Sequence, residues 1–309
     1  MEHRVFRDLT DYLAAGDCLV FNRSRVLPAR FEARRGSGGR RSALFLGETG
    51  PGQWRVLMEG AGKVRPGEVL AICGGGWSMT WLRHCGRGLC DVRIDPPEEA
   101  ATILRRVGTM PLPPYIRRDG SDAEEAAADR RDYQTVYADR DGSVAAPTAG
   151  LHFTDALIAA LKERGVLTAY LTLHVGLGTF QPVDAEDLAD HVMHREWYEL
   201  PPDAAGLIRR SRDGGGRIVA VGTTAARVLE TCHRDGPLSA GSGWTDLFIC
   251  PPHDFRATDA LITNFHLPGS TLLALVFAFA GRDQTLRAYR AAIDEGYRFY
   301  SYGDAMLIL

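Results

Sequence analysis

The sequence contains very little lysine and no long apolar run. Only Lys63 and Lys162 are lysines among 36 basic residues, so almost every cation is an arginine. The longest apolar run, residues 272–280, is far shorter than the roughly 20 residues that a membrane-spanning helix needs. No basic leader with an apolar core precedes the first structured segment, which favours a cytoplasmic location over secretion.

Cysteine is sparse as well: the chain has six, without a C-x-x-C pair. A disulfide scaffold or a zinc site would space its cysteines closely and regularly, so reduced thiols are the simplest interpretation and zinc the minor alternative. The apolar content of 45% over 309 residues is ordinary and suffices for about two domains with a substantial core.

Charge is distributed unevenly along the chain although the net charge is only −3. Residues 1–118 carry a net charge of +7 and residues 119–309 a net charge of −10. Two interpretations stay open: a coding bias toward arginine, or a basic face for a polyanion on an otherwise acidic protein.

Two different patterns of apolar residues along the chain indicate two domains. In residues 31–108 short apolar runs alternate with turn residues, which is typical of a small β-barrel. Elsewhere strands alternate with helices, which predicts an α/β layer with helices on both sheet faces. We therefore predict an α/β (mixed α+β) body of residues 1–30 and 109–309 with an inserted small β-barrel domain of residues 31–108. In the body we expect strands at 18–21, 166–173, 217–221, 246–249 and 260–263, helices at 5–13, 154–164, 204–213, 225–232, 270–280 and 284–295, and an extended end at 297–308.

Four of the nine histidines, with a glutamate close behind the last, fall within residues 145–200. Histidine changes its charge near neutral pH, so this cluster suggests proton transfer or metal binding. His174 ends a predicted strand beside glycines, where α/β folds bind ligands. For His191, His194 and Glu196 three interpretations stay open: metal ligands on one helical face, acid–base or hydrogen-bonding groups, or satisfied buried side chains.

Three further patterns offer sites for anions or bases. Gly222, Thr223 and Thr224 join a strand to a helix and form either an anion seat or an ordinary threonine cap; the G-x-G-x-x-G dinucleotide pattern is absent. Asn264 and His266 follow another strand. The loop with Arg34, Arg35, Arg40 and Arg41 suits phosphate contact or is a solvated hairpin tip, and Arg117 and Arg118 extend such a surface.

Taken together, these stretches closely resemble the S-adenosylmethionine:tRNA ribosyltransferase-isomerase family of bacterial queuosine synthesis. The matching segments cover nearly the whole chain in the family's order and include GDCLVFNRSRVLPARF, GTMPLPPYIRR, DYQTVYA, AAPTAGLHFT, LTLHVGLGTFQPV, HVMHREWYEL, AVGTTAARVLE, TDLFICPP, DALITNFHLPGSTLLALVFAFAG and YRFYSYGDAML.

The resemblance implies a reaction and its participants. The ribosyl moiety of S-adenosylmethionine is moved onto 7-aminomethyl-7-deazaguanine at the wobble position of tRNA, which gives epoxyqueuosine-tRNA, adenine and methionine. S-adenosylmethionine is then a co-substrate, with no true cofactor and no metal. The partner is the anticodon loop of the modified tRNA.

For this reaction we assign roles to particular residues as a hypothesis. Proton transfer is expected of His152, His174, His191, His194 and Glu196. Substrate binding is expected of Asn22, Arg23, Arg25, Tyr133, Gln134, Thr148, Gly178, Thr179, Gly222, Thr223, Thr224, Asn264 and His266, with the three residues at 222–224 holding the methionine carboxylate or a tRNA phosphate. Contacts with tRNA are expected of Arg34, Arg35, Arg40, Arg41, Arg117 and Arg118.

Two departures from the family pattern leave alternatives open. Family members usually begin with a few dozen residues ahead of the segment at 3–6, and they tend to have Pro-Gly-Tyr where this chain has Pro251, Pro252 and His253. One alternative is a non-catalytic RNA-binding relative with a shortened N-terminus. The other is an S-adenosylmethionine-dependent methyltransferase, which the missing glycine-rich loop after the first strand disfavours.

Overall fold

The structure is a computed structural model that describes residues 1–113, 115–116, 118, 122–176, 187–234 and 236–309. Gly178, Thr179 and Arg117, which the sequence proposes as binding residues, lie outside the described residues. The chain forms two compact units: an α/β unit of Met1–Ser24, Thr135–Arg140 and Ala146–Leu309, and a barrel unit of Arg25–Gln134 and Asp141–Ala145. Residues 109–134 fall in the barrel unit rather than in the body, and the proposed domain boundaries stay a prediction.

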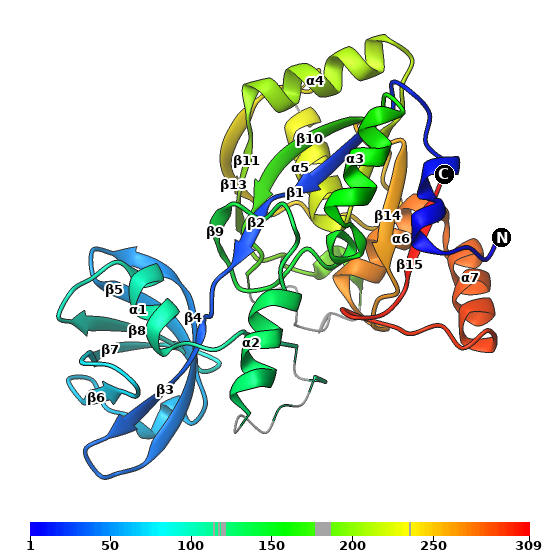
Figure 1. Cartoon of the computed structure of the whole chain (residues 1–309). Coiled ribbons are helices and arrows are strands. Elements are labelled where there is room, and N and C mark those ends of the chain that lie inside the picture. Colours follow the sequence, from blue (N-terminus) through cyan, green and yellow to red (C-terminus); the bar gives the residue numbers. More distant parts are fainter. Residues whose placement is uncertain (114, 117, 119–121, 177–186, 235) are drawn as a thin grey trace. The chain divides into compact units, whose positions relative to one another are not determined.

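A seven-stranded sheet forms the centre of the α/β unit, in the order β13-β11-β10-β1-β12-β14-β15 (Figure 1). The four central strands run parallel, while β11, β13 and β15 pair antiparallel at the two sides. The strands are β1 (Cys18–Asn22), β10 (Leu167–Leu173), β11 (Glu196–Leu200), β12 (Ile218–Val221), β13 (Gly241–Thr245), β14 (Ala260–Asn264) and β15 (Ala305–Ile308).

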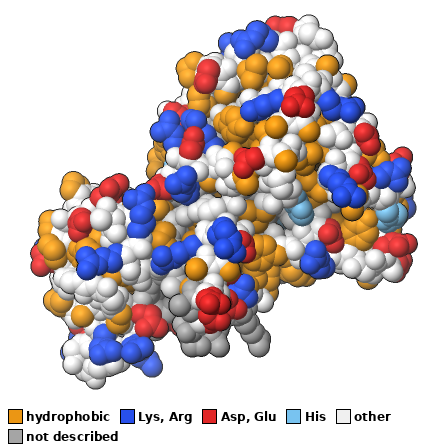
Figure 2. All heavy atoms as spheres, in the orientation of Figure 1, with side chains coloured by type: hydrophobic (Ala, Val, Ile, Leu, Met, Phe, Trp, Pro, Cys, Tyr) orange, Lys and Arg blue, Asp and Glu red, His pale blue; other side chains and the backbone are white. Residues whose placement is uncertain are grey.

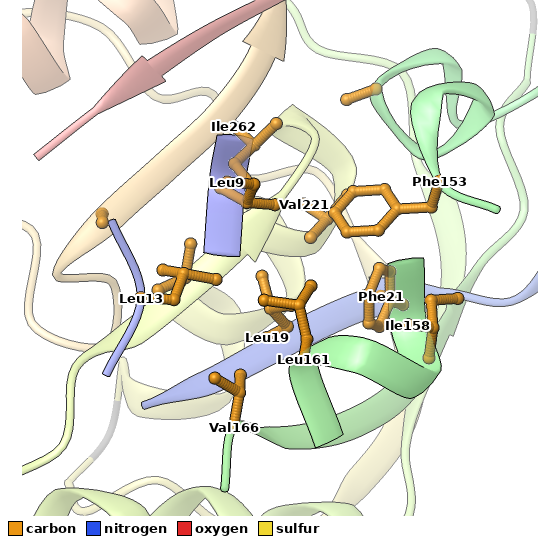
Figure 3. Close-up of a cluster of buried hydrophobic side chains, with 13 residues drawn as sticks. Leu9, Leu13, Leu19, Phe21, Phe153, Ile158, Leu161, Val166, Val221 and Ile262 are labelled. Atoms are coloured by element: carbon orange, nitrogen blue, oxygen red, sulfur yellow. The ribbon is translucent and has the colours of Figure 1, made fainter. Parts of the chain in front are cut away.

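Helices cover both faces of this sheet. Strand β1 is buried along its whole length, as expected of a parallel strand enclosed on both faces. One face packs Leu19 and Phe21 of β1 against Phe153, Ile158 and neighbouring side chains (Figure 3). The elements on that face are η1 (Phe6–Asp11), η3 (Thr148–His152) and α3 (Asp155–Glu163). The other face of the sheet packs on α4 (Pro202–Asp213) and α5 (Thr223–His233). Two further helices, α6 (Thr271–Ala280) and α7 (Arg282–Asp294), follow β14 in the chain.

An ion pair between a buried carboxylate and a partly exposed arginine ties two strands together at the amino end of the sheet. The carboxylate of Asp17, just before β1, accepts hydrogen bonds from Arg217 Nη2 at 2.6 Å and from the Ala14 amide at 2.9 Å. Burial alone would raise the pKa of Asp17, but these bonds outweigh it and hold that pKa below its usual value. This pair stabilises the edge of the sheet opposite the carboxyl ends of the parallel strands.

The barrel unit contains a closed barrel in the strand order β3-β4-β5-β8-β7-β6. Alternate side chains point inward; along β5, for example, Trp54, Val56 and Met58 are buried. The elements of this unit are β3 (Arg30–Arg35), β4 (Arg40–Gly50), β5 (Gln53–Met58), η2 (Ala61–Lys63), β6 (Val69–Ile72), β7 (Ser78–Gly86), β8 (Leu89–Asp95), α1 (Ala100–Val107) and α2 (Ala123–Asp132). Two short paired strands, β2 (Ser24–Val26) and β9 (Arg140–Ser143), each begin with the last residue of a segment of the α/β unit and continue in the barrel unit.

The predicted fold class, an α/β body with a small β-barrel inserted in its sequence, is confirmed. Three local predictions are wrong. Residues 246–249 do not form a strand. The strand is instead β13, which ends just before them, is rich in glycine and shows little apolar alternation. Only Ala305–Ile308 of the expected extended end is a strand, and the N-terminal helix is the 3-10 helix η1. Strand β11 had not been predicted. None of the helices within the described residues is long and apolar enough to cross a membrane.

Candidate functional site

The carboxyl ends of β10, β1, β12 and β14 lie along one edge of the sheet, because these strands are parallel neighbours. Ligands of open α/β sheets bind at this edge. Each strand ends at or next to a residue that the sequence proposes for the site: His174 after β10, Asn22 in β1, Gly222 after β12 and Asn264 in β14. The fold therefore gathers along one edge residues that are far apart in the chain.

Asn22 links three elements at this edge. Its Nδ2 donates to the Leu173 carbonyl at 3.0 Å and lies 3.3 Å from Thr224 Oγ1 at the start of α5. Its Oδ1 accepts from the amides of Leu173 and Ser24 at 3.0 and 3.1 Å. Because both amide atoms are engaged inside the protein and the residue is fully buried, Asn22 holds the strand ends in place, and its direct contact with substrate stays a prediction.

His174 is held from two sides. Its Nδ1 lies 2.8 Å from the Ser24 hydroxyl. Its ring stacks on Trp197 of β11, with centroids 5.2 Å apart and planes at 20°. Trp197 is paired in register with Trp244 of β13, which is 60% exposed. The result is a row of aromatic rings that runs from His174 to an open surface at the side of the sheet.

Asn264, at the end of β14, organises the other side of the site. Thr148 Oγ1 donates to its Oδ1 at 3.0 Å, and its Nδ2 donates to the Tyr300 carbonyl at 3.3 Å and lies 3.4 Å from His152 Nε2. The ring of Phe6 stacks on His152 with centroids 4.8 Å apart. His152 is thus enclosed by aromatic and amide groups.

The environment of His152 favours its neutral form. Burial lowers the pKa of His152 most; nearby Asp304 raises it and Arg298 lowers it, and the net direction is downward. A histidine that is neutral near pH 7 has a ring nitrogen able to accept a proton. This side chain therefore suits the role of a base.

Glu196 and Arg227 form a buried ion pair between β11 and α5, and they are 2% and 5% exposed. The other oxygen of Glu196 accepts from the Gly176 amide at 2.7 Å, and Arg227 Nε donates to the Leu247 carbonyl at 3.1 Å. Because both oxygens of Glu196 are engaged, its predicted role as a proton carrier stays a prediction.

The turn from β12 into α5 depends on one glycine. Gly222 has φ 89° and ψ 155°, a backbone region that is open essentially only to glycine. The turn places Thr223 and Thr224 in the first turn of the helix. They line a pocket together with Arg227, Thr271 and six apolar residues: Met193, Leu247, Phe248, Ile249, Leu272 and Leu275.

The predicted histidine cluster is separated in the structure. His152 and His174 meet the ends of β14 and β10, three strand spacings or roughly 14 Å apart. His191 and His194 do not share a helical face with Glu196, because residues 191–195 are irregular and Glu196 begins β11. No group of metal-ligating side chains forms among the described residues. His191 instead contacts Phe248, with ring centroids 4.9 Å apart.

Other proposed binding residues are engaged within their own unit. His266 is buried beside Thr263 Oγ1, 2.7 Å from its Nε2, and burial lowers the pKa of His266 to about 4. Gln134 bonds both backbone groups of Val26, and Tyr133 is fully buried. Carboxylates lie near most of the proposed arginines, in the pairs Arg23–Asp139, Arg23–Glu199, Arg25–Asp141, Arg35–Glu68, Arg40–Glu32 and Arg118–Asp129.

The charged surface agrees with these pairs. On the face shown in Figure 2, acidic side chains lie among the basic ones in each unit. Arg40, whose side chain is 64% exposed, and Arg34 are the members of the predicted basic loop that face water most openly. Their contact with tRNA stays a prediction.

Sequence reasoning missed four residues of this region: Ser24, Trp197, Arg227 and Trp244. All four lie inside or beside segments that had been singled out, and Arg227 is the one charged residue in the otherwise small or apolar first turns of α5. That isolated charge on a buried helix was the available signal. Ser24 and the two tryptophans acquire their place only through strand pairing.

Comparisons with known proteins agree with this architecture. A family model described as queuosine biosynthesis protein matches residues 1–308. The crystal structure of an S-adenosylmethionine tRNA ribosyltransferase from Thermotoga maritima is 38% identical to this chain, with a TM-score of 0.53. The match covers 100% of this chain and 88% of that one.

Proposed function

Since the chain belongs to the queuosine biosynthesis protein family, we propose that it is an S-adenosylmethionine:tRNA ribosyltransferase-isomerase. It transfers and isomerises the ribosyl moiety of S-adenosylmethionine onto 7-aminomethyl-7-deazaguanine at the wobble position of tRNA. The products are epoxyqueuosine-tRNA, adenine and methionine. S-adenosylmethionine is consumed as a substrate, and the reaction uses no further cofactor and no metal.

One observation carries the proposal beyond family membership. Asn22, His174, Gly222 and Asn264 come from four neighbouring parallel strands and lie along the edge of the sheet where α/β folds bind ligands. His152 and His174 stand toward the two ends of this edge. An extended substrate such as S-adenosylmethionine, with an amino acid at one end and a nucleoside at the other, suits a site spread over several strand ends.

The chemistry needs three proton movements. The sulfonium acidifies the adjacent ribose 5′ protons, and a base must remove one of them. Adenine leaves as the bond from its N9 to the ribose breaks, and it requires a proton or a hydrogen-bond donor. The aminomethyl nitrogen loses a proton as it bonds to the ribosyl carbon. Methionine leaves with the electron pair of the ribosyl carbon–sulfur bond, which neutralises its sulfonium, as the C–O bond of the epoxide forms. His152, neutral near pH 7, and His174, oriented by Ser24 and Trp197, are the groups to which we assign these transfers.

The aromatic row supports an RNA substrate. The wobble base lies in a single-stranded loop, so it and its neighbours can unstack and lie against aromatic side chains. Trp244 offers an exposed ring in line with Trp197 and His174. A base stacked there would lie two strands away from His174, with Trp197 between them.

One assay distinguishes this function from its alternatives. The protein is incubated with S-adenosylmethionine and with tRNA that carries the 7-aminomethyl base, and the small products are separated. We expect free adenine and methionine, and neither with the same tRNA carrying guanine at that position. S-adenosylhomocysteine would instead indicate a methyltransferase. Binding of tRNA without any small product would indicate a non-catalytic relative.

A further inference from the structure

The guanidinium of Arg227 has one buried nitrogen without a hydrogen-bond partner among the described residues. Nε donates to Leu247 and Nη1 pairs with Glu196, whereas Nη2 is inaccessible to solvent and has no acceptor. The side chain as a whole is only 6% exposed. A buried N–H of a charged group without an acceptor costs free energy, so an acceptor supplied by a ligand resolves this arrangement.

Arg227 lines the same pocket as the first turn of α5. Thr223 and Arg227 lie four residues apart on one face of this eleven-residue helix, and Thr224 lines the pocket beside them. The amide groups of a helix N-terminus and its dipole attract negative charge. The pocket therefore combines a cationic side chain with a helix N-terminus, which is an arrangement that binds an anion.

The remaining wall of the pocket determines which anion fits. Most of it is an apolar surface, to which Thr271 adds one hydroxyl; the apolar residues are Met193, Leu247, Phe248, Ile249, Leu272 and Leu275. The enclosed space at the base of the pocket is about 10 Å³, which has room for one water-sized group such as a carboxylate oxygen, and it opens to solvent at its mouth. A short apolar chain that ends in a carboxylate matches these walls. A sugar phosphate would place polar groups against the apolar side.

We propose that Arg227 and the first turn of α5 bind the α-carboxylate of the methionyl half of S-adenosylmethionine, with the methylene chain against the apolar wall. This assignment rests on the proposed function, in which S-adenosylmethionine is a substrate. Glu196 then acts as a positioning residue: it holds the guanidinium of Arg227 and, through the Gly176 amide, ties it to the end of β10. The sequence-based predictions assigned no role to Arg227.

Binding of two ligands tests the proposal without any turnover. Sinefungin keeps the amino-acid carboxylate of S-adenosylmethionine, whereas 5′-methylthioadenosine lacks it but keeps the nucleoside. We expect Arg227→Lys to weaken sinefungin binding roughly tenfold or more, as for loss of a charge-assisted hydrogen bond. We expect its affinity for 5′-methylthioadenosine, measured by calorimetry on the whole protein, to stay the same.

Two further variants control for folding and for charge. Arg227→Met combined with Glu196→Gln removes both charges of the buried pair, so that no uncompensated carboxylate remains, and it should show the same selective loss. Arg217→Lys alters another arginine paired with a buried carboxylate, at the amino end of β12. This control should leave the affinities for both ligands unchanged.

The possible outcomes separate the two levels of the proposal. If wild-type protein binds both ligands and the Arg227 variants lose neither, or lose both equally, the carboxylate assignment is wrong while the proposed function stands. If wild-type protein binds neither ligand, S-adenosylmethionine is not the substrate, and both proposals are overturned. A selective loss of sinefungin binding in both Arg227 variants supports the assignment.

Discussion

The Ser24 hydroxyl and His174 Nδ1 lie 2.8 Å apart although 150 residues separate them in the chain. They meet because Ser24 follows β1, His174 follows β10, and these two strands are parallel neighbours in register. Stacking on Trp197 holds the other side of the same imidazole. The orientation of His174 is thus set by three strands together.

Replacing Ser24 tests whether this contact positions His174. Ser24→Ala removes one hydrogen bond, worth about 1 kcal/mol, so kcat for adenine release should fall roughly five- to tenfold while KM for S-adenosylmethionine stays constant. The control is Ser143→Ala. This substitution also removes a buried serine hydroxyl, one that donates to the Ala145 carbonyl. A rise in KM with unchanged kcat would mean that Ser24 contacts the substrate instead.

Trp244 should contribute to RNA binding by stacking. Trp244→Ala is expected to weaken binding of an anticodon stem-loop RNA by about 1–3 kcal/mol, whereas Trp244→Phe keeps most of the affinity. The salt dependence should not change, because stacking releases no counterions. Ile293→Ala, an equally exposed apolar residue on α7, serves as the control in fluorescence titrations. Equal affinities of wild type and Trp244→Ala would contradict stacking at this position.

The basic loop makes a separate, electrostatic prediction. If Arg40 and Arg41 bind tRNA phosphates, replacing both by alanine lowers the slope of log Kd against log salt by roughly 1 for each phosphate that is no longer neutralised. The variant Arg282→Ala with Arg290→Ala removes the same charge from α7 and should not alter the slope. A slope that stays constant in the Arg40 and Arg41 variant would show that the loop is a solvated hairpin tip.

His266 should make the stability of the protein depend on acid. Its pKa is about 4 in the folded protein against 6.5 in the unfolded chain. The unfolded chain therefore binds more protons between these values, so the free energy of unfolding falls as pH drops from 6.5 to about 4 and is fully recovered above 6.5. The depressed pKa corresponds to a loss of roughly 3 kcal/mol.

Urea unfolding of wild type and His266→Gln across this pH range measures the effect. The variant should lose less stability on acidification, because glutamine does not take up the proton. The exposed His3→Gln substitution provides a control that should leave the pH dependence as in wild type. Parallel curves for wild type and His266→Gln would show that His266 is protonated equally in both states.

Much of this protein follows from local sequence. Apolar alternation in residues 31–108 identified the barrel, and the glycine and threonines at 222–224 identified the start of α5, because periodicity and turn chemistry depend on adjacent residues. Local pattern failed where tertiary packing decides: the apolar residues at 247–249 suggested a strand, but they line a pocket, while the polar, glycine-rich β13 pairs at the side of the sheet.

The sequence by itself determined which residue types stand at the strand ends and to which family the chain is similar. Only the tertiary structure decided that His174 meets Ser24, that Glu196 pairs with Arg227, and that His152 and His174 stand at separate strand ends. The physical reason is that strand order and register are set by packing over the whole domain. Contacts between residues 31 to 150 positions apart therefore leave no mark in any local pattern.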